Sequence, residues 1–441
     1  MSAPRAGSAT AAAELRRPRR ALVTVLAVVF LDLLGFGIII PILPFYVRSF
    51  GVSDVYIGLL AASYSAMQFL FAPLLGSLSD RRGRRPVILV SVAGSALAWT
   101  VFGLAGSVAV LFVSRMLAGA MGGNLAAAQA YVSDVTPPER RAGAFGLVGA
   151  AFGLGFIFGP ALGGAFASDA AVTFARGTLP GFVPVTRFSL PSFAAALLSL
   201  LNFGFAALFL EESGARATAV ARARWLSSFR SALSDDSLRG LVVAFFLLSV
   251  AFSGVQVMFV PFAADRYGYG ATGTALLLTY IGVLGVAFQG VLVGRLSRRY
   301  PDASLAVAGA ALLALALAAL PFAPDIGRAL VPRFGGPAFL TREAVALVAV
   351  LPGLSLGNAL LSVSLTTLVS KSAGADVQGS AFGITQGVGS LGRTVGPPVM
   401  ASLYVVAFWT PFAVGAVLLV GTLVVVAGLR GVAPAVVGVE R

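Results

Sequence analysis

Residues 22–44 read LVTVLAVVFLDLLGFGIIIPILP, an apolar run whose only charged side chain is Asp32. A run of this length can cross the hydrocarbon core of a bilayer, which is about 30 Å thick. Twelve such runs follow one another along the 441 residues. They lie near 21–47, 55–78, 86–105, 108–133, 142–167, 191–210, 239–263, 272–294, 303–323, 344–369, 377–404 and 406–429. The sequence therefore predicts an all-α membrane protein with twelve transmembrane helices.

The composition supports this class. Hydrophobic residues make up 58% of the chain and charged residues 11%, whereas soluble domains carry about 25% charged residues. Glycine and proline are scattered through the runs, but membrane helices tolerate both, so we do not end spans at them. The chain has neither cysteine nor histidine. This excludes disulfides, thiolate or imidazole metal sites and Ser-His or Cys-His nucleophile pairs, and we expect no metal and no cofactor.

The basic residues predict the topology. If the N-terminus is cytoplasmic, most of the 31 Lys and Arg fall in cytoplasmic segments, as the positive-inside rule requires. The net charge of +14 then serves to hold the protein against an anionic inner leaflet and not against a nucleic acid. The first apolar run is too long for a cleaved signal peptide. We expect a multi-pass protein of the plasma (cytoplasmic) membrane with both termini in the cytoplasm.

The chain also repeats itself. Residues 76–79 recur as 294–297, and residues 155–160 recur as 392–397. Two six-helix halves in the same orientation form the parallel-repeat plan of many secondary transporters. We therefore predict a cytoplasmic N-terminal segment, a six-helix bundle, a cytoplasmic linker, a second pseudo-symmetric six-helix bundle and a cytoplasmic tail, over residues 1–20, 21–210, 211–238, 239–430 and 431–441.

The loop expected between the second and third spans reads GSLSDRRGRR over residues 76–85. The positive-inside rule explains its arginines but not its ordered glycines and aspartate. The stretch resembles the signature cytoplasmic loop of the major facilitator superfamily, which implies that it controls conformational switching. The residues of this gating loop are Gly76, Asp80, Arg81, Gly83, Arg84 and Arg85. Arg298 occupies the position of Asp80 in the second copy, so we do not expect a symmetric gate.

Glycines of the fifth predicted span form a second motif. Gly155, Gly159 and Gly163 are four residues apart, which places them on one helix face where a neighbouring helix can approach closely. The span resembles the motif associated with the superfamily's antiporters, although plain helix packing would also account for such a strip. The motif residues are Gly146, Gly155, Gly159, Pro160, Gly163 and Gly164.

The fourth predicted span carries an arginine. Leu111, Arg115, Gly119 and Gly123 resemble the motif that buries an arginine in this family, although Ala118 stands where many relatives have glutamine. Charged residues at membrane depth usually mark function, but an arginine held in a structural ion pair would leave the same pattern.

Asp32 is the predicted site residue whose side chain could bind and release a proton within a span. At about 1.5 Å per residue it lies near the bilayer midplane, and no other acid of the chain lies at that depth. With Gly35, Pro41 and Pro44 it resembles the first helix of the twelve-span drug and proton antiporters. Its repeat position in the second half is Ser249, so only the first half has this acid. We predict that Asp32 is the proton-coupling residue.

Polar residues within the other spans are candidates to line a substrate cavity. A hydrogen bond between helices is the alternative explanation for each of them. The candidates are Gln68, Arg115, Asn124, Gln256, Gln289, Asn358, Gln386 and Arg393.

The sequence therefore predicts a secondary active transporter that works by alternating access and exports small, drug-like molecules in exchange for protons. The expected partners are the lipid bilayer, a small-molecule substrate and protons, and we expect a monomer. An uptake carrier or facilitator for a sugar or an anionic metabolite is the alternative, with Arg115 and Arg393 holding the anion. An enzyme is not expected, because the chain lacks GxxxxGK[ST], HExxH and a clustered pair of intramembrane acids.

Overall fold

The computed structural model describes residues 18–213, 236–333, 341–372 and 378–429. Most of the predicted N-terminal segment 1–20, most of the linker 211–238 and nearly all of the tail 431–441 lie outside these residues. Every element within them is helical. The elements up to residue 213 are α1 (Pro18–Ile39), α2 (Leu43–Ser49), α3 (Val55–Arg82), α4 (Arg84–Gly103), α5 (Val108–Met121), α6 (Asn124–Val135), the short η1 (Pro138–Arg140), α7 (Arg141–Phe166), α8 (Asp169–Thr178) and α9 (Ser189–Phe209).

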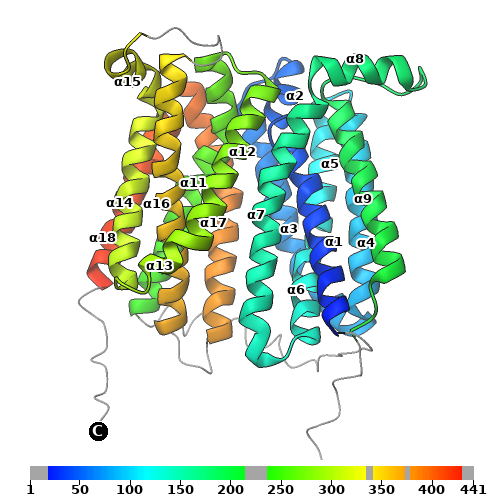
Figure 1. Ribbon diagram of the computed structural model, residues 1–441, viewed down its shortest axis with the longest axis horizontal. Helices are drawn as coiled ribbons and strands as arrows, with labels where there is room; N and C mark the ends of the chain where they lie inside the picture. Colours follow the sequence, from blue (N-terminus) through cyan, green and yellow to red (C-terminus); the bar gives the residue numbers. More distant parts are fainter. Residues whose placement is uncertain (1–17, 214–235, 334–340, 373–377, 430–441) are drawn as a thin grey trace, which may run out of the picture. The chain divides into compact units, whose positions relative to one another are not determined.

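The elements of the second half follow the same pattern (Figure 1). They are α11 (Asp236–Tyr267), α12 (Ala271–Ala287), the π-helical η2 (Phe288–Val293), α13 (Gly294–Leu296), α14 (Asp302–Ala319), η3 (Leu320–Phe322), α15 (Ala323–Leu330), α16 (Arg342–Ser372), α17 (Gln378–Val406) and α18 (Thr410–Leu429).

Eleven helical stretches among the described residues are long and apolar enough to cross a membrane. They match eleven of the twelve predicted runs. The remaining run, 377–404, coincides with α17, whose 29 residues are long enough to cross but include several glycines, Gln386 and Arg393, which make the helix less apolar. The predicted class, an all-α membrane protein, is confirmed.

Proline and glycine affect the spans in two ways. Pro73, Pro160 and Pro352 lie inside helices that continue past them, as the sequence predicts. The first span is different, because α1 ends at Ile39 and α2 begins at Leu43, on either side of Pro41. The fourth span is likewise divided into α5 and α6 at Gly122. A proline lacks the backbone donor that a continuous helix needs, so an interruption at Pro41 is chemically expected.

The helices pack into two compact units. The first contains the described residues up to Val52, the stretch from Ser63 through α9, and Tyr269–Gly282. The second contains Ser53–Ala62, α11 through Gly268, and the residues from Val283 onward. The start of α3 thus belongs to the second unit, and the start of α12 to the first. The bundle boundaries expected from the sequence remain predictions.

The same packing occurs in both halves of the chain. Helix α1 lies against α7 and α9, and α11 lies against α17 and α18. Helix α4 lies against α5 and α9, and α14 lies against α16 and α18. Each helix therefore has the neighbours that its counterpart has, and the internal repeat seen in the sequence is also a repeat of the fold.

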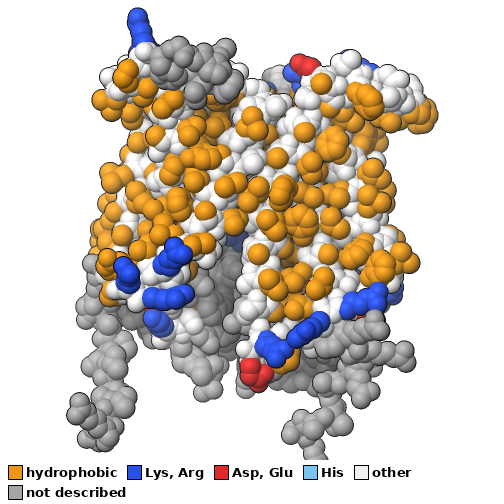
Figure 2. All heavy atoms as spheres, viewed as in Figure 1, with side chains coloured by type: hydrophobic (Ala, Val, Ile, Leu, Met, Phe, Trp, Pro, Cys, Tyr) orange, Lys and Arg blue, Asp and Glu red, His pale blue; other side chains and the backbone are white. Residues whose placement is uncertain are grey.

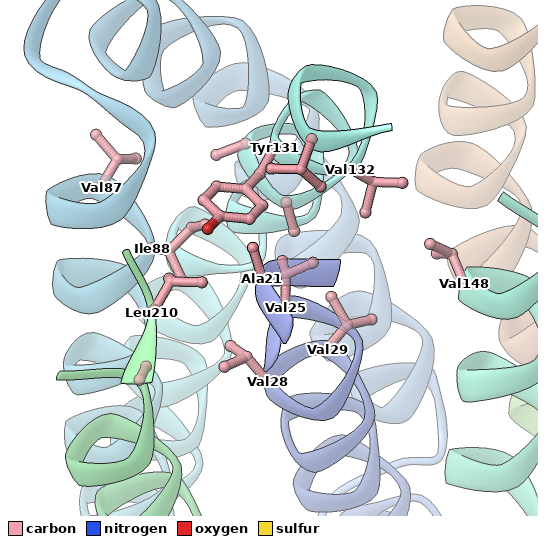
Figure 3. Close-up of a cluster of buried hydrophobic side chains, with 14 of the residues drawn as sticks. Ala21, Val25, Val28, Val29, Val87, Ile88, Tyr131, Val132, Val148 and Leu210 are labelled. Atoms are coloured by element: carbon pink, nitrogen blue, oxygen red, sulfur yellow. The ribbon is translucent and has the colours of Figure 1, made fainter. Parts of the chain in front are cut away.

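A cluster of buried apolar side chains joins α1, α4, α6 and α7 in the first unit (Figure 3). Val25 on α1 and Val132 on α6 are fully buried, and so is Tyr131, whose hydroxyl donates to the carbonyl oxygen of Glu211 at 2.8 Å. Hydrophobic side chains cover the sides of the helices, and lysine and arginine side chains gather near their ends (Figure 2). This distribution suits helices surrounded by lipid.

Glycines bring α7 directly onto α1. A Cβ atom added to Gly155 would meet Leu33, one added to Gly159 would meet the backbone of Gly37, and one added to Gly163 would meet the backbone of Ile38. The predicted glycine strip is therefore a contact surface for α1, beside Asp32. In contrast, a Cβ at Gly146 would meet nothing within 4 Å.

This contact generates a prediction about stability. Gly159→Leu should push α7 away from α1 and destabilise the protein by about 1–3 kcal/mol, the usual cost of overpacking. Gly146→Leu, in the same helix, is the matched control and should leave stability unchanged, because its surroundings are open. Thermal unfolding in one detergent measures both. Equal melting temperatures for the two variants would contradict the packing role of Gly159.

Candidate functional site

Asp32 lies in α1 and is partly buried. The side-chain amide of Asn124, at the start of α6, donates to Asp32 Oδ2 at 3.3 Å, and the Ser95 side chain of α4 makes a second hydrogen bond. Among the described residues Asp32 has no salt bridge. Of the predicted site residues, the structure therefore brings Asp32 and Asn124 together, and it surrounds the acid with uncharged partners from two other helices.

Arg115 does not pair with Asp32. The arginine lies in α5 with 4% of its surface exposed, and its Cζ atom is 4.6 Å from the centre of the Trp99 ring and 5.0 Å from that of Phe102. The Tyr64 ring lies at 5.8 Å. Aromatic faces attract a guanidinium group, so these rings partly replace a counter-ion. Arg115 Nε and Nη2 nevertheless have no hydrogen-bond acceptor among the described residues, and neither does the neighbouring Trp99 Nε1.

The small residues after Arg115 form a packing surface for α3. The backbone of Tyr64 would block a Cβ at Gly119, and Ala72 lies 3.0 Å from the Cβ position of Gly123. Gln68 of α3 donates through Nε2 to the carbonyl oxygen of Gly122 at 3.3 Å, where α5 gives way to α6. Gln68 thus satisfies a backbone acceptor at a helix break, which is the structural role that the sequence left open for it.

The remaining cavity candidates lie in the second unit. Arg393 is exposed on α17, and a Cβ added to the nearby Gly389 would lie 3.5 Å from Arg393 Nη1 and 3.4 Å from the hydroxyl of Ser249, the repeat position of Asp32. Gln386 is exposed on the same helix. The others are Gln256 on α11 and Gln289 in the π-helical η2, both exposed, and the half-buried Asn358 on α16. Their role in a substrate cavity stays a prediction.

The predicted gating loop is built around Arg84. This buried arginine pairs with Asp80 through Nη1 and with Asp134, at the end of α6, through Nε at 3.0 Å. Gly83 has a φ of +102°, a conformation that side chains rarely adopt, so the turn requires a glycine. Gly76 lies further back in α3, Arg81 and Arg82 are exposed, and Arg85 donates to the carbonyl oxygen of Ala207 at 2.7 Å.

Two residues of this network escaped the sequence reasoning. Glu212, just after α9, accepts from the backbone N–H of Arg84 at 2.7 Å and of Arg85 at 3.2 Å, and so caps the start of α4. Asp134 also accepts from the Ser213 hydroxyl at 2.9 Å. Both acids lie at span ends on the side predicted to be cytoplasmic. That position is the signal in the sequence that could have identified them as partners of the loop arginines.

The second unit has the equivalent ion pair with its charges exchanged. Arg84 is the first residue of α4, and Asp302 is the first residue of its counterpart α14. Asp134 is the last residue but one of α6, and Lys371 is the last residue but one of α16. Lys371 Nζ lies 2.6 Å from Asp302 Oδ2. An ion pair therefore joins corresponding helix ends in both halves, although the signature loop itself is not repeated.

The exchanged pair generates a prediction. Asp302→Lys places two cations together, and Lys371→Asp places two acids together, so each should destabilise the protein by about 1 kcal/mol, given that Lys371 is exposed. The double variant restores an ion pair and should recover most of the loss. Thermal unfolding of all four proteins measures the coupling. The exposed pair of Asp325 and Arg328 is the control, where reversal should change little. Additive losses at Asp302 and Lys371 would contradict the pairing.

Comparisons with known proteins agree with this architecture. The family model described as Major Facilitator Superfamily matches residues 25–397. The chain is 34% identical over 313 residues to the tetracycline resistance protein, class C, of Escherichia coli, which covers 70% of this chain and 75% of that protein. It is 30% identical over 439 residues to the Major facilitator superfamily domain-containing protein 10 of Bos taurus, covering 90% and 91% of the two chains.

A solved structure is similar over the same extent. The crystal structure of the human organic anion transporter MFSD10 has a TM-score of 0.64 and 25% identity, and the match covers 93% of this chain and 99% of that one. The family model matches most of this chain. The repeated helix packing and the ordered motif of residues 76–85 agree with that match. The chain therefore belongs to the Major Facilitator Superfamily and is a multi-pass membrane transporter of small molecules rather than an enzyme.

Proposed function

We propose that this protein exports a small, drug-like molecule across the cytoplasmic membrane in exchange for protons. The observation that carries the proposal is Asp32, an acid in the middle of a span whose hydrogen-bond partners are the uncharged Asn124 and Ser95. The similarity to tetracycline resistance proteins makes tetracycline the first solute to test.

Coupling to protons requires a group inside the pathway that can bind and release them. A proton that moves down the membrane potential releases about 2.3 kcal/mol per 100 mV, and only a group that binds and releases protons inside the pathway can use that energy. Asp32 has no salt bridge in the described part of the chain, so no fixed cation holds it in its ionised form. Its partial exposure leaves a route for proton exchange. The glycine strip of α7 lies directly beside it and belongs to a motif that resembles the antiporter signature.

If Asp32 couples transport to protons, the other predicted residues and segments take the following roles. The polar residues predicted to line a substrate cavity would contact the solute during alternating access, as the parallel-repeat plan implies. The loop around Arg84 would control switching from the cytoplasmic side. The termini would be cytoplasmic, because the basic loops would then lie inside, and the protein would act as a monomer.

Asp32→Asn tests the proposal. Asparagine has nearly the size of aspartate and still accepts hydrogen bonds through its one side-chain oxygen, but it cannot exchange a proton, so export against a gradient and its pH dependence should both be lost while the solute still binds. Asp32→Glu keeps an acid and should keep part of the pH-dependent transport. The control is Asp325→Asn, which changes an exposed acid of α15 and should transport normally.

Transport is measured in inside-out membrane vesicles at several pH values, with and without a proton gradient. Solute binding is measured on the purified protein by the rise in its melting temperature. Full proton-driven transport by Asp32→Asn would refute the coupling role. A loss of folding in Asp32→Asn that a second substitution at Arg115 or Arg393 repaired would also refute it, by indicating a structural ion pair.

The surroundings of Arg115 favour a second candidate function, the transport of an organic anion. The Arg115 Nε and Nη2 donors are buried and have no acceptor in the described part of the chain, and an anionic solute could supply one. The human protein MFSD10, whose crystal structure is similar to this chain, is an organic anion transporter, which agrees with this candidate. In this version the protein would be a carrier for organic anions, with Arg115 and the exposed Arg393 as the recognition groups.

A matched pair of ligands separates the two functions. If Arg115 recognises an anion, Arg115→Gln should weaken binding of a carboxylate solute by about tenfold or more, the value of a charge-assisted hydrogen bond, and should hardly affect the corresponding amide. Arg115→Lys keeps the charge and should lose less. Binding is followed by thermal shift on the purified variants. Equal losses for carboxylate and amide would assign Arg115 a structural role only.

A further inference from the structure

The connection between α7 and α9 is unusually long for a loop between spans, and it contains a helix. Helix α8 begins three residues after α7 ends, and the chain returns to α9 at Ser189. In Figure 1, α8 lies across the ends of α7 and α9 instead of running beside them. Because α7 and α9 are both candidate spans, the connection is tied at each end to the same membrane surface.

The connection is held in a defined shape. The Ser168 side chain caps α8 by accepting from the backbone N–H of Ala171 at 3.3 Å. Arg176 Nε donates to the carbonyl oxygen of Val185 at 3.1 Å, which folds the returning chain back along the helix. Arg187 and Asp169 form an ion pair at 3.0 Å between the two ends of the connection. The backbone that carries Phe174 and Phe182 is therefore held in a defined fold.

Helix α8 has one apolar face, and protein covers only part of it. Val172 and Ala175 are buried, whereas Phe174, which lies one turn after Ala171 at a spacing of three residues, is 73% exposed. Phe182 in the returning chain is 86% exposed, and Leu179 is exposed too. The polar side of α8 carries Asp169, Thr173 and Arg176. An amphipathic helix with an aromatic residue on the uncovered part of its apolar face, followed by a second in the returning chain, is suited to the boundary between lipid headgroups and acyl chains.

We infer that α8 and the returning chain to Phe188 form an interfacial anchor, which lies in the headgroup region and inserts Phe174 and Phe182 into the leaflet. The occupant of the apolar face is lipid, because both ends of the connection join candidate spans, and those spans expose apolar side chains of their own, such as Leu162 on α7 and Leu197 on α9. The anchor would fix the depth of these two helices in the bilayer. This inference does not depend on the transported solute or on proton coupling.

The absence of cysteine from the chain makes a direct test simple. A nitroxide label is attached to Phe174→Cys, to Phe182→Cys and, as the matched control on the polar side of the same helix, to Thr173→Cys. The full-length variants are reconstituted into vesicles of phosphatidylethanolamine and phosphatidylglycerol. Collisions of each label with oxygen, which concentrates in lipid, are compared with collisions with a water-soluble nickel chelate.

Labels at residues 174 and 182 should collide mainly with oxygen, and the label at residue 173 mainly with nickel. If nickel reaches residue 174 as freely as residue 173, the face lies in water and the inference is wrong. If both reagents are excluded from residue 174, protein covers the face, which also overturns a lipid-facing anchor. Leu179→Cys provides a further lipid-facing site if Phe174→Cys fails to elute as a folded protein.

Discussion

Lipid tails cannot form hydrogen bonds, so the backbone polar groups that this chain carries into the membrane must find their partners within the chain. The backbone does this by forming helices. Polar side chains then depend on how closely the helices approach, and glycine sets that distance where Gly159 meets Gly37 between α7 and α1. Asp32 lies in α1 beside this contact and reaches Asn124 of α6 and Ser95 of α4. The close packing of the first unit thus places an acid among neutral donors.

The separation of the two deep charges in the first unit has a physical consequence. Had Asp32 and Arg115 formed an ion pair, each would have fixed the charge of the other, and proton exchange would have required breaking the pair. Arg115 instead lies against the rings of Trp99 and Phe102, while Asp32 has uncharged partners. The acid is then free to change its protonation without losing a counter-ion. This arrangement supports a coupling role for Asp32 and leaves Arg115 available for a different task.

The sequence predicts much of this organisation, because the length and spacing of apolar runs translate directly into spans. Repeated glycines and prolines also predicted which helices correspond. The sequence could not predict that Arg115 lies in an aromatic surrounding, since Tyr64, Trp99 and Phe102 come from two other helices and their approach depends on tertiary packing. The sequence also could not predict that the ion pair of Arg84 and Asp134 is replaced in the second half by that of Asp302 and Lys371. A repeat search compares residue types, and here the acid and the base have exchanged positions. Helix α8 was missed because its ten residues are too short and too polar for a span.

The most direct test of the account is solute accumulation by the purified protein in liposomes under an imposed pH gradient. With an acidic lumen and no nucleotide, a solute that binds the protein, tetracycline first, should accumulate inside above its external concentration. Nigericin, which collapses the gradient, should release it, and protein-free liposomes correct for passive trapping. Accumulation that follows the gradient is the result that a proton-coupled exchanger predicts. Mere equalisation of the solute across the membrane, whatever the gradient, would contradict it.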